Sequence, residues 1–186
     1  SLHSEASQIA TALGSDPTEW ELLKVELMAW QGRDEDTRFV VELLTGELAE
    51  SFGAGVVVNL ANVALTTLEL GQGRYRAAFD AAMKVFEVDP MPQGNRILPD
   101  LVEAAVRCGE PEVARQAYER LEERALAAGT PWALGLLARS KALLAADDAA
   151  DRHYAESSEL LSQTDVASDL ARTRLLHGEW RRRGKR

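Results

Sequence analysis

The strongest acidic motif of the chain is DDAAD, which covers Asp147 to Asp151. Clustered carboxylates of this kind can hold Mg²⁺, a hard cation that prefers oxygen ligands, against a pyrophosphate. The motif falls in a short predicted turn between two helices, however, where the dipole of the following helix favours acidic residues on its own. A second acidic metal motif is absent from the sequence. We therefore do not expect an enzyme that acts on pyrophosphates.

The other residues that could do chemistry are scattered. His3, His153 and His177 lack the spacing of metal ligands, and the single cysteine, Cys108, has no histidine near it in sequence and is expected to be a half-buried thiol. Gly71-Gln72-Gly73 lacks the downstream Lys-Ser/Thr of a phosphate-binding loop. We expect a non-enzymatic chain without a catalytic constellation, a metal site or a cofactor of its own.

The composition indicates a helical protein. Of 186 residues, 46% are apolar, and Ala and Leu supply 29 and 26 residues against 15 for Val and Ile together. This ratio favours helix, in which β-branched side chains lose more rotamer freedom. No run approaches the roughly 20 apolar residues of a membrane span, and the first residues lack the pattern of a secretory signal. The expected location is cytoplasmic, without membrane contact.

The net charge of −9 is unevenly distributed. Residues 181–186, RRRGKR, carry five positive charges, which leaves −14 on residues 1–180 from 16 basic and 30 acidic side chains. An acidic body is not the electrostatic footprint of a nucleic-acid-binding protein. The terminal cluster could contact phosphate, but cations at a solvated helix end are the simpler interpretation.

Glycines that break predicted helices recur at a similar interval. Gly32, Gly73 and Gly109 each follow one apolar-periodic stretch and precede another, and Ala145 and Gly184 stand at equivalent places. The spacings are 41, 36, 36 and 39 residues. They predict a helix–turn–helix unit that repeats about every 37–40 residues.

The unit that begins at Gly73 follows the tetratricopeptide pattern most closely. It places Tyr75, Ala78, Ala82, Val85 and Pro90 at the characteristic offsets. Small residues at Ala78 and Ala82 let the second helix approach the first closely, and Pro90 cannot continue the helix. A larger side chain at Ala82 should therefore overpack this helix pair.

The predicted fold is all-α: one domain, residues 1–186, in which antiparallel helix pairs form an α-solenoid, a tetratricopeptide-like superhelix with about nine helices and a concave face. The helices are expected at about 18–31, 34–52, 56–70, 74–88, 95–107, 111–129, 131–146, 149–163 and 166–183. Pro111 opens the sixth helix, and Thr130-Pro131 caps the seventh. The short run VVVNL lies inside a helical frame.

Candidate binding residues follow from this register, because certain positions of the first helices should face the groove. These positions are Arg96, Glu103, Arg107, Trp132, Arg139 and Arg174. A row of arginines there could clamp a carboxylate or phosphate of a bound segment through paired hydrogen bonds. Alternatively, Glu103 and Arg107, four residues apart on one helix, simply pair with each other. If Arg139 lies on the groove surface, its replacement by Glu should change stability by no more than about 0.5 kcal/mol.

Four segments carry a resemblance to a known family: LPDLVEAAVRCGEPEVA (98–114), AAGTPWALGLLARSKALLA (127–145), HYAESSELL (153–161) and LARTRLLHGEWRRRGKR (170–186). They resemble the helical-repeat region of large actinobacterial LuxR-type transcriptional regulators, which share the plan of the maltose regulator. GQGRY and the upstream MAWQGRDED extend the similarity, whereas VVVNLANVALTTLEL departs from the more aromatic first helix usual in the family. The positions that match family motifs are Glu103, Arg107, Trp132, Arg139, Arg172 and Glu179.

The resemblance implies a non-catalytic, signal- or partner-binding module excised from a larger regulator. A protein or a small anionic effector would bind in the concave groove. ATP and DNA would be bound only by an ATPase domain and a C-terminal helix-turn-helix, neither of which is present in these residues, and pairing into a homodimer is compatible with the sequence. The alternative is a stand-alone tetratricopeptide adaptor that holds an extended or helical peptide of a partner protein.

Overall fold

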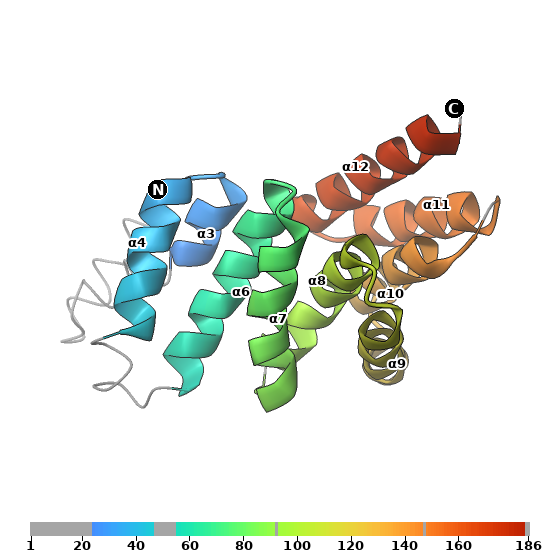
Figure 1. Cartoon of the computed structure of the whole chain (residues 1–186). Coiled ribbons are helices and arrows are strands. Elements are labelled where there is room, and N and C mark those ends of the chain that lie inside the picture. The colour runs from blue at the N-terminus through green and yellow to red at the C-terminus, as the bar shows by residue number, and fades with distance from the viewer. Residues whose placement is uncertain (1–23, 47–54, 92, 147, 185–186) are drawn as a thin grey trace. The chain divides into compact units, whose positions relative to one another are not determined.

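The computed structural model describes residues 24–46, 55–91, 93–146 and 148–184. Regular structure in these residues consists of nine helices and no strand, so the all-α prediction is confirmed (Figure 1). The helices are α3 (Val25–Trp30), α4 (Asp34–Thr45), α6 (Gly55–Gly71), α7 (Tyr75–Val88), α8 (Gln93–Cys108), α9 (Pro111–Ala128), α10 (Pro131–Leu144), α11 (Asp148–Ser162) and α12 (Ala167–Gly184). None of them combines the length and the apolarity that a bilayer span requires.

The chain divides into two compact units, Ser1–Val85 and Phe86–Arg186. In the first, α3 and α4 pack on α6, and in the second the helices from α8 to α12 pack on one another. Consecutive helices pack within each unit, as helix pairs should. The continuous array over residues 1–186 stays a prediction.

Three of the landmark glycines end helices in the left-handed region of the backbone, with φ of +70° at Gly32, +71° at Gly73 and +74° at Gly109. In each turn, the amide after the glycine donates to a carbonyl five residues earlier: Arg33 to Met28, Arg74 to Glu69 and Glu110 to Ala105. This Schellman pattern satisfies carbonyls at the helix end. The sequence-based repeat boundaries therefore correspond to one recurring turn.

Two landmarks behave differently. Ala145 is extended, with φ of −77° and ψ of 147°, because a residue with a Cβ avoids the left-handed region. Gly184 is the last residue of α12, and the residues after it lie outside the described part of the chain. The predicted second helix is also too long, because α4 ends at Thr45 and Gly46 leaves the helical conformation. Part of that predicted helix (47–52), and the beginning of the first one (18–23), lie outside the described residues.

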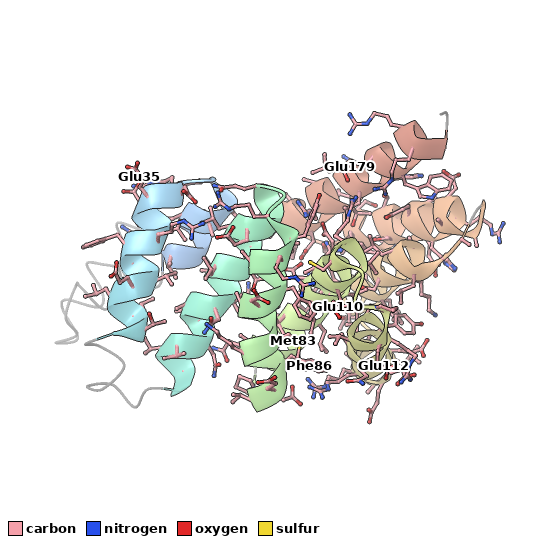
Figure 2. All side chains as sticks on the ribbon, in the orientation of Figure 1. Glu35, Met83, Phe86, Glu110, Glu112 and Glu179 are labelled. Carbon is pink, nitrogen blue, oxygen red and sulfur yellow. The ribbon has the colours of Figure 1, made fainter. Side chains whose placement is uncertain are left out.

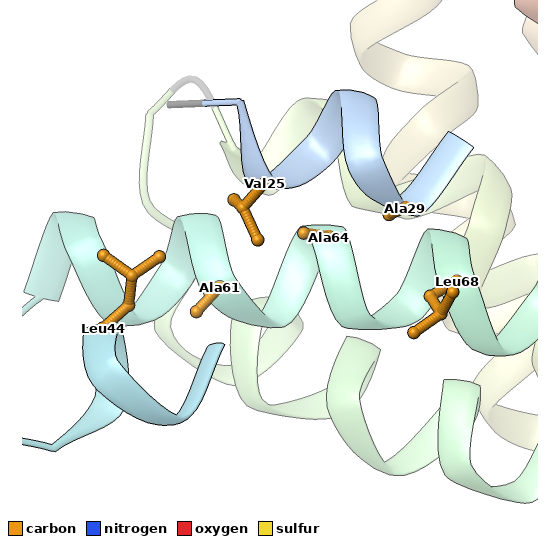
Figure 3. Close-up of a cluster of buried hydrophobic side chains, with 6 residues drawn as sticks. All are labelled: Val25, Ala29, Leu44, Ala61, Ala64 and Leu68. Carbon is orange, nitrogen blue, oxygen red and sulfur yellow. The ribbon is translucent and has the colours of Figure 1, made fainter. Parts of the chain in front are cut away.

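The core of the first unit lies where α3 and α4 meet α6 (Figure 3). Its buried members are Val25, Ala29, Leu44, Ala61, Ala64 and Leu68. Alanines on α6 allow the shorter helices to approach its backbone closely, and Val40, Val41, Val57, Leu60 and Leu65 pack around them. The run VVVNL is part of α6, as its helical frame predicted.

The repeat register predicts most of the buried positions in both units; the exception in α9 is Tyr118, at the offset of Ala82, which is only half-buried. Ala78, Ala82 and Val85 of α7 are fully buried. The equivalent positions Ala114 and Leu121 of α9, and Ala150, Tyr154 and Ser157 of α11, are buried as well. Thr130 Oγ1 accepts from the amide of Ala133 at 3.2 Å, which confirms the predicted cap of α10.

Ala82→Leu should lower the free energy of unfolding by about 1–3 kcal/mol, because Ala82 is 0% exposed and extra methylenes would force its neighbours off their rotamers. Urea denaturation checks this value. Ala77→Leu, at an exposed position of the same helix, is the matched control and should be close to neutral. Equal effects of the two substitutions would contradict the assigned register.

A glycine in α10 sets the distance between α10 and α11. A Cβ on Gly135 would lie 2.7 Å from Cγ of Leu161, which is fully buried, and Ser157 Oγ donates to the Gly135 carbonyl at 2.8 Å. Gly135→Ala gains about 1 kcal/mol of helix propensity but loses more to this overlap, so we expect a net loss of about 1–2 kcal/mol.

The matched control for Gly135→Ala is Gly178→Ala in α12. A Cβ on Gly178 would meet nothing within 4 Å, so alanine there should stabilise the chain by about 0.5–1 kcal/mol. Thermal unfolding of the two variants should therefore shift in opposite directions. Stabilisation by both substitutions would mean that α10 and α11 can move apart at little cost in stability.

Candidate functional site

The predicted groove residues lie on α8, α10 and α12, the first helices of successive predicted pairs. Neighbouring helices run in opposite directions, as contacts in α8–α9 and in α11–α12 show. Arg124 near the end of α9 donates from Nη1 to Oδ1 of Asn95 in the first turn of α8, at 2.7 Å, and Arg181 near the end of α12 donates from Nε to Oδ1 of Asp151 at the start of α11, at 2.9 Å. Ion pairs described below join α8, α10 and α12 in the same direction, as stacked pairs require.

Arg139 of α10 is the centre of these contacts. Only 1% of the residue is exposed. Its Nη1 donates to Oδ1 of Asp169 on α12 at 3.2 Å, and its Nη2 lies 3.5 Å from Oδ1 of Asp100 on α8. Its Nε is buried and has no hydrogen-bond partner among the described residues. Trp132, two turns earlier on α10, donates from Nε1 to Oδ2 of Asp169 at 2.8 Å.

Two further ion pairs join α8 directly to α12. Arg172 binds Glu103 through two hydrogen bonds, of which the one from Nε measures 3.0 Å. Glu103 is 1% exposed, so this fork-shaped pair is withdrawn from water. Arg107, one turn after Glu103, donates to Glu179 of α12, which Figure 2 labels. Glu103 and Arg107, which could have paired with each other, each pair with a residue of α12.

Together these residues form an ion-pair cluster of four carboxylates and three guanidinium groups. Its members are Asp100, Glu103, Arg107, Arg139, Asp169, Arg172 and Glu179. Removing such charges from water costs several kcal/mol for each ion, and close pairing must offset that cost. The arrangement can therefore hold the three helices α8, α10 and α12 together, and each arginine already has a carboxylate.

The surroundings strongly raise the pKa of an aspartate and of a tyrosine in this region. Burial raises the pKa of Asp100 to about 6; Arg139 opposes the rise, and Glu103 and Asp169 add to it. Burial likewise raises the pKa of Tyr154 on α11 to about 12. A carboxyl that titrates near neutrality is the unusual group of the cluster.

The structure brings together four of the six predicted site residues, namely Glu103, Arg107, Trp132 and Arg139. Arg96, at the start of α8, and Arg174, on α12, are exposed and lie outside the ion pairs of the cluster. Arg139 was expected on the groove surface and is instead buried, because Asp169 and Asp100 enclose its guanidinium. The near-neutral effect that was predicted for a surface arginine is therefore no longer expected at this position.

Two members of the cluster are absent from the sequence-based set. Asp100 lies three residues before Glu103 on α8, and Asp169 lies three residues before Arg172 on α12, so each pair shares one helix face. That spacing was the available signal. Arg172 and Glu179 were recognised only as matches to family motifs.

Asp151 and His177 join α11 to α12. Oδ1 of Asp151, the last residue of DDAAD, is 2.7 Å from Nε2 of His177 and also accepts from Arg181. These two contacts, with Arg181 first, lower the pKa of Asp151 to about 2. The His177 ring stacks on Tyr154 with a centroid distance of 5.1 Å. Cys108 is half-buried, and within the described residues no group of His, Cys, Asp and Glu side chains is arranged to hold a metal ion.

Comparison with known proteins finds no matching family model, no match among curated proteins and no match among solved structures.

Proposed function

We propose that the chain is a non-catalytic, signal- or partner-binding helical-repeat module of a LuxR-type transcription regulator. The observation that supports this is the ion-pair cluster, because α12 contacts both preceding first helices, α8 and α10, through it. A ligand that changed one of these ion pairs would change the packing of α8, α10 and α12 at once. Such a ligand shifts the packing only by its different affinity for the two arrangements.

The cluster suggests the chemistry of the ligand. Arginines form paired hydrogen bonds with carboxylate and phosphate groups, so an anionic group could replace a carboxylate of α12 on its arginine. The ion pair of Arg107 and Glu179 is the most accessible pair of the cluster, because these side chains are 13% and 28% exposed. The side chain of Arg139, by contrast, is 2% exposed. A small anionic effector or an acidic segment of a partner protein would therefore compete with Glu179.

In a regulator of this plan, neighbouring domains would bind ATP and DNA, and the helical-repeat module would pass the signal to them. The cytoplasm is the compartment in which that task is carried out. The stand-alone adaptor remains the alternative, and it predicts a bound peptide without any effect on transcription.

The experiment is a comparison of transcripts in the source organism. Deletion of the gene should define a set of affected transcripts, and chromosomal Glu179→Gln should change the same set because it weakens the link between α8 and α12. Glu119→Gln is the matched control, since Glu119 is exposed on α9 and pairs only with Arg115 of the same helix in the described structure. A deletion that leaves transcripts unchanged would reject the regulator and favour the adaptor.

A further inference from the structure

The ion-pair cluster contains one carboxylate more than it has arginines. Glu103 has Arg172, Glu179 has Arg107, and Asp169 accepts hydrogen bonds from Arg139 and from Trp132. Asp100 is the fourth carboxylate, and it shares Arg139 at 3.5 Å rather than having an arginine of its own. Geometry alone thus identifies Asp100 as the incompletely neutralised charge.

Water can do little to stabilise the charge of Asp100, because the side chain is only 19% exposed. The charged groups that act on it come from all three first helices: Glu103 from α8, Arg139 from α10, and Asp169 and Arg172 from α12. The two carboxylates repel a negative charge on Asp100, and the two arginines are already engaged by those same carboxylates. Protonation of Asp100 would remove the surplus charge without breaking any of the three other pairs.

We propose that Asp100 is a proton-binding site that makes the packing of α8, α10 and α12 sensitive to pH. Mild acid protonates Asp100 and stabilises the packed arrangement of the three helices. At neutral and alkaline pH the ionised carboxyl weakens that arrangement.

The sign of this pH dependence follows from the linkage between protonation of Asp100 and folding. The pKa of Asp100 is raised to about 6 in the folded chain, against an ordinary value of 3.8, so the folded state binds more protons than the unfolded state between these values. The contribution of Asp100 to stability is therefore largest at low pH and is lost as the pH rises through about 6. Asp151, whose pKa is lowered, contributes in the opposite direction, so the test must isolate Asp100.

The experiment compares the intact chain with Asp100→Asn, whose side chain has nearly the same shape and does not ionise. Urea unfolding of both proteins at pH 5 and pH 7.5 gives the ratio of their unfolding equilibrium constants. We expect this ratio, wild type over variant, to rise about tenfold from pH 5 to pH 7.5. Asp80→Asn, at an exposed position of α7, should give a ratio independent of pH. A constant ratio for Asp100→Asn would overturn the proposal.

A second measurement needs no variant. Nuclear magnetic resonance of the wild-type chain can follow the carboxyl carbon of Asp100 through a pH titration. A midpoint near the raised pKa of about 6 supports the proposal. A midpoint at or below 4.5 overturns it, whatever the stability of Asp100→Asn.

Discussion

Arg139→Glu is expected to lower the free energy of unfolding by about 4–5 kcal/mol or more, which makes it the most damaging single change proposed for the second unit. Arg139 is 1% exposed and lies between Asp169 and Asp100. The substitution leaves these two carboxylates without their shared counter-charge and adds a third carboxylate beside them. Urea or thermal denaturation measures the loss, and hydrogen exchange in α8, α10 and α12 should locate it.

The control for Arg139→Glu is Arg174→Glu, which makes the same charge reversal at an exposed position of α12. That change should alter stability by no more than about 0.5 kcal/mol, as for ordinary surface substitutions. If Arg139→Glu were equally mild, the side chain at position 139 would have to reach solvent at little cost in stability. The buried position described above would then be wrong.

Glu103→Ala is expected to cost about 3–5 kcal/mol. It removes both hydrogen bonds to Arg172 and opens a small cavity at a position that is 1% exposed. Arg172→Ala should cost a similar amount, because it leaves the Glu103 carboxylate buried without this guanidinium. The measurement is again the free energy of unfolding, taken at a pH where Asp100 has one charge state in all variants.

A double-mutant cycle measures the interaction energy between Glu103 and Arg172 separately from the other losses that each truncation causes. The double variant Glu103→Ala/Arg172→Ala should lose clearly less than the sum of the single losses, with a coupling of about 2–3 kcal/mol. Glu112 and Arg115, an exposed pair on α9, provide the matched cycle and should couple by less than about 1 kcal/mol. Additive losses at the buried pair would show that Glu103 and Arg172 stabilise the chain independently of each other.

The local structure was largely predictable because it depends on neighbours in sequence. Glycines that adopt positive φ, and prolines that start helices, mark their own positions, so most helix ends were predicted to within two residues. The exception is α4, whose end at Thr45 comes before the predicted residue 52. Its apolar pattern continues past Gly46, and periodicity gives no warning when a helix stops inside such a pattern.

The ion-pair cluster was predictable only in part. Periodicity placed Glu103, Arg107, Trp132 and Arg139 on one side of their helices, and the structure brings them together. Which charges pair depends on how closely the first helices approach one another, and that distance is a property of the packed unit. Sequence spacing could therefore propose arginines open to a ligand, but it could not show that carboxylates of α12 already occupy Arg107 and Arg139.

The direct pairing of α8 with α12 has an evolutionary consequence. Glu103 and Arg172 are 69 positions apart, and Arg107 and Glu179 are 72 apart, yet each residue can change its sign only if its partner changes too. In an alignment of homologous sequences, we therefore expect correlated substitutions at these two pairs of positions. Some homologues should have the acidic and the basic residue of a pair exchanged. Arg174, which is exposed on α12 and lies outside the cluster, should drift without such correlation.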